Sequence, residues 1–173
     1  MRFVQAFGLS LFLCSVSFVL AGGIGLPRKE DVPKYLKQLQ SSQVAADRAK
    51  AAEMLGKRGG INANDVEDAI DPLKKSLQKD IDAKVRAAAA RALGNIHPDA
   101  EGTVDLLIER LKNDSSMDVK MASVVALGQY GPEAKDALPA LKDLSKKFDP
   151  KKSKEGPTIM NTIQLITMKK KKG

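Results

Sequence analysis

The sequence has few of the residues that thiol and zinc chemistry require. Its 173 residues include one cysteine, one histidine and no tryptophan. Cys14 and His97 cannot supply the four ligands of a structural zinc site, and a single cysteine excludes a disulfide within the chain. Aromatic residues make up only 4 % of the sequence, so Ala, Leu, Val and Ile must form the core. Such side chains favour closely packed helices over a β-sandwich.

The N-terminal segment is typical of a secretory signal. Arg2 precedes an apolar stretch over residues 6–20, and the segment ends in Val19-Leu20-Ala21. This pattern predicts a signal peptide over 1–21, cleaved after Ala21, and export to the periplasm or the extracellular space. A retained N-terminal membrane anchor is the alternative, because the apolar segment is long enough to span a bilayer. Residues 22–31 are expected to form a linker, and no disulfide-linked partner is expected for the mature chain.

One phrase occurs three times, each time ending in glycine. DRAKAAEMLG ends at Gly56, VRAAAARALG at Gly94 and VKMASVVALG at Gly128, so the copies are 38 and 34 residues apart. A second apolar segment with leucines four residues apart precedes each of the two later copies, as in Leu73 and Leu77. A fixed period in this range is typical of a solenoid.

Each unit is predicted to be a helical hairpin. Apolar residues in the later phrases recur at helical spacing, and the alanines allow one helix to lie close against the next. We expect Gly94 and Gly128 to end their helices as C-terminal caps in the left-handed conformation. The predicted fold is therefore all-α, a short α-solenoid of about three to four hairpins.

Charged residues recur with the same register. Asp80 precedes Arg86 by six residues, as Asp114 precedes Lys120, while the first unit has Ser42 and Arg48 at these places. Such a carboxylate and cation can bond within one unit or between neighbouring units.

These units resemble HEAT repeats, of the short type named for phycobilisome lyases, over residues 32–148. The resemblance implies that Asp80, Arg86, Asp114 and Lys120 form a ladder along the stack of hairpins. Lys120 stands where that pattern has arginine, so a bidentate contact with a carboxylate is lost there.

The C-terminal part departs from the repeat. A polar loop is predicted over 149–157 and a closing helix over 158–168, with Ile159, Ile163 and Ile166 at helical spacing. A basic tail follows over 169–173.

No arrangement of residues predicts catalysis. His97 precedes a proline in a loop and is expected to be a solvated turn residue. Asp65, Glu67 and Asp68 lack the spacing of a calcium loop, and we expect them to lie in a segment that caps a helix. The chain is therefore expected to have no enzymatic activity, no metal and no cofactor.

The net charge of +8 leaves two interpretations open. It can serve solubility alone, or the tail residues Lys169, Lys170, Lys171 and Lys172 can attract an anionic envelope surface. Nucleic acid is not expected as a partner, because aromatic residues that could stack on bases are nearly absent.

The favoured interpretation is an exported, non-catalytic scaffold that binds an unknown protein partner. Its second helices would line the inner face of the solenoid. The outward polar positions of these helices are the candidate contacts: Lys50, Glu53, Lys57, Arg91, Asn95 and Gln129. The alternatives are an accessory subunit of a lyase or cofactor-handling complex, and a basic adaptor to an anionic envelope polymer or membrane surface.

Overall fold

The computed structural model describes residues 26–148 and 152–168. The predicted signal peptide, the first three residues of the polar loop and the basic tail lie outside these ranges. Within them the chain is helical and contains no strand. The α-helices are α1 Val32–Ser41, α2 Ala45–Gly59, α3 Ile70–Lys79, α4 Ala83–Ile96, α5 Thr103–Asn113, α6 Met117–Tyr130, α7 Leu138–Ser145 and α8 Glu155–Thr167. Three short 3-10 helices accompany them: η1 Lys29–Asp31, η2 Ala63–Ala69 and η3 Gly131–Ala137.

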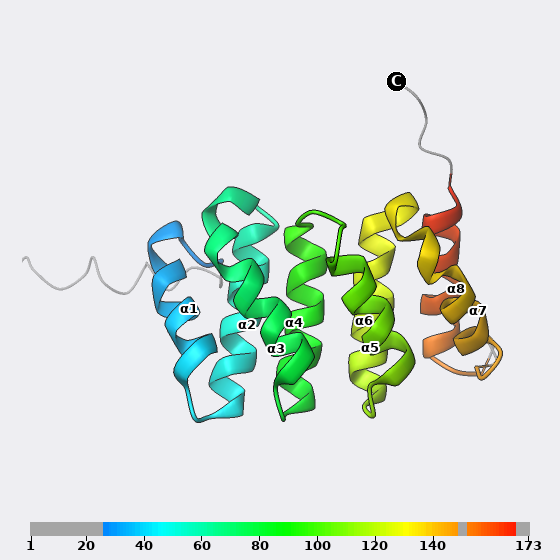
Figure 1. Ribbon diagram of the computed structural model, residues 1–173, viewed down its shortest axis with the longest axis horizontal. Coiled ribbons are helices and arrows are strands. Elements are labelled where there is room, and N and C mark those ends of the chain that lie inside the picture. Colours follow the sequence, from blue (N-terminus) through cyan, green and yellow to red (C-terminus); the bar gives the residue numbers. More distant parts are fainter. Residues whose placement is uncertain (1–25, 149–151, 169–173) are drawn as a thin grey trace, which may run out of the picture.

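The helices form four successive antiparallel hairpins, so the predicted α-solenoid is confirmed. Figure 1 shows two rows of helices that run from α1 at one end to α8 at the other. The first helices α1, α3, α5 and α7 form one row, and the second helices α2, α4, α6 and α8 form the other. Second helices pack closely on one another, whereas first helices touch each other much less.

The core lies between the two rows and follows from the apolar periodicity. Leu73 and Leu77 of α3 are fully buried, and so are Val85 and Leu93 of α4. Because these residues recur three, four, seven or eight positions apart, each helix presents one apolar stripe to its neighbours. The same stripes in successive hairpins make one continuous core, which is how a solenoid gains stability from short units.

The repeated glycines do not cap helices, and this expectation was wrong. Gly94 and Gly128 lie inside α4 and α6, whereas the residues at the two helix ends are His97, in the left-handed helical conformation, and Gly131, each with a positive φ of 53°. The helix interior therefore continues through each glycine. His97 occupies the left-handed position after α4, which histidine adopts more readily than most residues.

The glycines instead allow neighbouring second helices to approach closely. A Cβ on Gly56 would lie 2.6 Å from Ala92 Cα, and one on Gly94 would lie 2.8 Å from Ala126 Cα. Both distances are far below van der Waals contact. The absence of a side chain at these positions thus sets the spacing of α2, α4 and α6.

Helix α8 takes the place of a fourth second helix. Gly128 faces Thr162 of α8, as Gly94 faces Ala126 of α6, so Thr162 stands at the equivalent position. The Thr162 hydroxyl also donates to the Val124 carbonyl at 3.3 Å. This helix begins at Glu155, three residues before the expected start at 158, because a proline is tolerated in the first turn of a helix.

Candidate protein-binding surface

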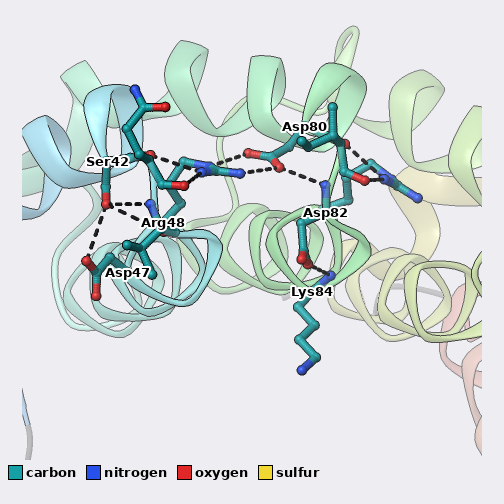
Figure 2. Close-up of polar contacts among 10 residues, drawn as sticks. Ser42, Asp47, Arg48, Asp80, Asp82 and Lys84 are labelled. Carbon is teal, nitrogen blue, oxygen red and sulfur yellow. Dashed lines mark hydrogen bonds and ion pairs between the residues drawn. The ribbon is translucent and has the colours of Figure 1, made fainter.

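A row of arginine–aspartate pairs joins successive hairpins along the edge where their turns lie. Figure 2 shows the first pair, in which Arg48 of α2 reaches Asp80 in the turn between α3 and α4. Its Nε and Nη2 donate to the two carboxylate oxygens at 2.7 and 2.9 Å. Its Nη1 donates to the Ser42 carbonyl at 2.9 Å. One guanidinium therefore holds its own turn and the next hairpin together.

The second pair repeats this geometry one hairpin further along. Arg86 of α4 donates to both carboxylate oxygens of Asp114 at 2.8 and 2.9 Å. Its Nη1 donates to the Asp80 carbonyl at 2.9 Å. Each of these two arginines thus pairs with the aspartate of the following hairpin. The six-residue spacing in the sequence allowed a bond within one unit or between neighbouring units, and the structure shows the bond between units.

Each aspartate also stabilises its own turn. Asp80 Oδ1 accepts from the Asp82 amide, and Asp114 Oδ1 accepts from the Ser116 amide, both at 2.9 Å. Burial disfavours the charged form of both carboxylates. The arginine and amide hydrogen bonds outweigh that effect, and the pKa values of Asp80 and Asp114 lie below the usual value.

Lys120, the fourth predicted member of the ladder, is not brought to a carboxylate in the described part of the chain. Its ammonium donates to the Lys112 carbonyl at 3.1 Å. It therefore contacts the last turn of helix α5 in its own hairpin but makes no bidentate pair. Arg48, in contrast, was not among the predicted ladder residues, although its position six residues after Ser42 repeats the register of Arg86.

All six predicted contact residues are exposed on one surface. We call the surface of α2, α4, α6 and α8 that points away from the first helices the second-helix face. Five of the six surround a hollow of about 1010 Å³ between α2 and α4: Lys50, Glu53, Lys57, Arg91 and Asn95. Gln129 lies on the next second helix, α6, and its amide donates to Asn95 Oδ1 at 2.8 Å.

The hollow combines an apolar floor with a cationic rim. Ala49, Ala88 and Ala92 line it together with Met54. Around this floor stand Lys50, Lys57, Lys84 and Arg91. The Lys84 side chain extends away from the arginine–aspartate row in Figure 2. Glu53 is the only acidic residue in the lining, and it forms an ion pair with Lys57 at 2.6 Å.

The other sequence candidates occupy structural positions. His97 stacks on Tyr130 with ring centroids 4.4 Å apart, and the Tyr130 hydroxyl donates to the Pro98 carbonyl. Asp65 lies in η2 and pairs with Arg58 and Lys29, so it ties α2 to the chain before α1. Glu67 and Asp68 are exposed in the same segment.

The described residues contain neither a metal-binding cluster nor a membrane-spanning helix. Within residues 26–148 and 152–168, no group of three or more His, Cys, Asp or Glu side chains could hold a metal ion. None of the helices in these ranges is long and apolar enough to cross a membrane. The four lysines predicted to contact an anionic surface lie outside the described residues.

Comparison with known proteins supports the repeat assignment. The family model described as HEAT repeats matches residues 70–152, which include helices α3 to α7. This part of the chain is therefore similar to HEAT repeats, and α1, α2 and α8 extend the same arrangement of helical hairpins on both sides. A search of curated proteins found no match to the chain.

Proposed function

We propose that the protein is an exported, non-catalytic scaffold that binds a protein partner on its second-helix face. HEAT repeats commonly mediate protein–protein interaction. The observation that carries the proposal is the hollow between α2 and α4, where exposed cations surround an apolar floor. A floor of small side chains lets a partner approach the helices closely, and the charged rim selects among partners.

The arginine–aspartate ladder supports this role, because it makes the surface rigid before binding. Arg48 and Arg86 each join two hairpins through at least three hydrogen bonds. A surface that is already ordered loses little conformational entropy when a partner binds. The ladder lies along the turn edge and therefore leaves the second-helix face accessible.

A second, additive role is recruitment to an anionic envelope surface. The net charge of +8 and the run of lysines at 169–172 favour it. This role would place the scaffold near its partner without occupying the second-helix face. A function as accessory subunit of a lyase or cofactor-handling complex is a special case of partner binding.

Site-specific photo-crosslinking in the native host tests the main proposal. A photoreactive residue is placed at Lys57 or Arg91 on the second-helix face, and at Lys37 or Lys112 on the exposed sides of α1 and α5 as controls. We expect a discrete crosslinked protein adduct from the second-helix positions and none from the controls. Adducts that form only from the first-helix positions, or from none of the four, would overturn the proposal.

A further inference from the structure

The second-helix face changes its chemistry from one end of the solenoid to the other. Arg48, Arg86 and Lys120 occupy equivalent positions in successive repeats, 38 and 34 residues apart. The same two steps identify the equivalent positions on the surface of α2, α4 and α6. One row of outward positions therefore reads Lys57, Asn95 and Gln129, and a neighbouring row reads Glu53, Arg91 and Val125. Both rows start charged and lose their charge towards α6.

The equivalence of Thr162 with Ala126 extends these rows onto α8. Leu165 then follows Gln129, and Asn161 follows Val125. Leu165 also lies beside α6, because its Cδ1 would be 3.5 Å from a Cβ on Gly128. The row that begins with a lysine on α2 thus ends with a leucine on α8.

The α2–α4 half of the face carries cations without partners. The side chains of Lys50, Lys84 and Arg91 make no ion pair or hydrogen bond with any other residue in 26–148 and 152–168, whereas Lys57 is paired with Glu53. Three of the four cations around the hollow are therefore available to an anionic ligand. We call this half the cationic half.

The α6–α8 half carries exposed apolar side chains instead. Val125 is 42 % exposed, Leu165 37 % and Met168 51 %. The charged residues of α6 are confined to its first turns, at Asp118 and Lys120, and α8 has only Glu155 at its start. We call this half the apolar half.

We infer that the second-helix face takes a protein segment in which a cluster of acidic residues adjoins a cluster of apolar residues. The acidic cluster lies over α2 and α4, and the apolar cluster lies over α6 and α8. This inference rests on the proposed function and specifies the chemistry of the partner. Helices packed 8–10 Å apart place the outer two of four about 30 Å from each other. About nine residues in extended form, or about 20 in helical form, span that distance.

Charge complementarity favours such a segment over a second copy of this chain. In a face-to-face two-fold dimer the cationic half of one copy would cover either the cationic half or the apolar half of the other, depending on the direction of the axis. Neither arrangement brings a cluster of carboxylates to Lys50, Lys84 and Arg91. An acidic–apolar segment satisfies both halves at once.

Selection from a phage-displayed library of random peptides, about 20 residues long, tests this inference on the immobilised full chain. We expect enriched peptides in which Asp and Glu cluster beside Leu, Val, Ile or Phe. Selected peptides that are neutral or basic, or a library without any binder, would overturn the inference. A dimer in sedimentation that Val125→Ser abolishes would identify a second copy as the occupant and would also overturn it.

The affinities of the selected peptides are then measured for three double variants of the chain. These measurements test whether the cationic half and the apolar half both contribute to binding. Lys50→Glu with Arg91→Glu is expected to weaken binding about tenfold or more, because two attractive charges become repulsive. Val125→Ser with Leu165→Ser should weaken it to a similar degree without changing the net charge. The control, Lys37→Glu with Lys112→Glu, changes the net charge by the same amount as the first variant but should leave affinity unchanged.

A control as harmful as the cationic-half variant would show that only net charge matters, and the inference would fail. It would also fail if the apolar-half variant, shown by circular dichroism to be folded, bound as tightly as the wild type. The crosslinking experiment separates the two proposals. Adducts from Lys57 and Arg91 combined with basic selected peptides would keep the scaffold function and remove the acidic–apolar partner.

Discussion

Alanine substitution of the repeated glycines should affect stability according to what each glycine faces. Gly94 faces backbone, since a Cβ there would lie 2.8 Å from Ala126 Cα and 2.9 Å from Ala126 Cβ, and it would also collide with Gln129 Oε1. Gly128 faces a side chain, with Thr162 Oγ1 at 3.1 Å and Leu165 Cδ1 at 3.5 Å. A side chain can rotate away, whereas the backbone of α6 can yield only if the whole helix moves.

Two opposing contributions set the magnitude. Alanine is favoured over glycine in a helix interior by about 1 kcal/mol, and overpacking a close contact costs about 1–3 kcal/mol. At Gly94 the contact is with backbone, so we take the upper part of that range. Gly94→Ala should then lower the free energy of unfolding by about 1–2 kcal/mol. At Gly128 the helical gain offsets the small adjustment of Thr162, and Gly128→Ala should change stability by less than about 0.5 kcal/mol.

Urea denaturation followed by circular dichroism measures the difference, and thermal melting provides a second reading. A loss of about 1–2 kcal/mol in a chain of this size lowers the melting temperature by roughly 2–8 °C. Gly56→Ala should behave like Gly94→Ala, because its Cβ would lie 2.6 Å from Ala92 Cα. The reasoning is refuted if Gly128→Ala destabilises the protein as much as Gly94→Ala does.

Three further predictions address the core, the ladder and the N-terminal segment. Leu93→Ala should cost about 2–5 kcal/mol in urea denaturation because Leu93 is fully buried, whereas exposed Arg91→Ala should cost less than about 0.5 kcal/mol; equal losses would contradict the assigned faces. Arg86→Ala should cost about 3 kcal/mol, because Asp114, whose side chain is 1 % exposed, loses its bidentate partner and keeps only the more distant Arg110 at 3.8 Å. The folded-state pKa of Asp114 is lowered, so its contribution is complete above the unfolded pKa of about 4 and is lost as pH falls through the folded value; a wild type equally stable at pH 7 and pH 3 would contradict this. N-terminal sequencing of the exported protein should begin at Gly22, and a membrane-bound form that begins at Met1 would favour the anchor.

The sequence predicts the hairpins well because each helix repeats its apolar stripe. Leu73 and Leu77 are buried as their spacing predicts, and the outward positions Lys50, Arg91 and Asn95 are exposed on the face assigned to them. Local periodicity determines which side of a helix is apolar. It therefore also identifies the opposite side, where a partner can bind.

Contacts between repeats were harder to predict, because they depend on distances that one helix does not contain. A glycine near a helix end predicts a cap, and nothing in VRAAAARALG indicates that Ala126, 32 residues after Gly94, would come against it. The ladder presented the same difficulty, since a six-residue spacing fits a bond within one unit or to the next. In the structure Arg48 pairs with Asp80, and Arg86 pairs with Asp114 of the following hairpin.

The positions that face a neighbouring helix and those that face solvent differ in how much they vary between repeats. Glycine recurs at the close contacts of α2, α4 and α6, and at Gly56 and Gly94 a side chain would push the helices apart. One residue further along each helix, the outward position changes from Lys57 to Asn95 and then to Gln129. Surface substitutions of this kind alter stability by less than about 0.5 kcal/mol. Folding therefore constrains the outward row very little, and the row's change from Lys57 through Asn95 and Gln129 to Leu165 is consistent with the partner proposed above.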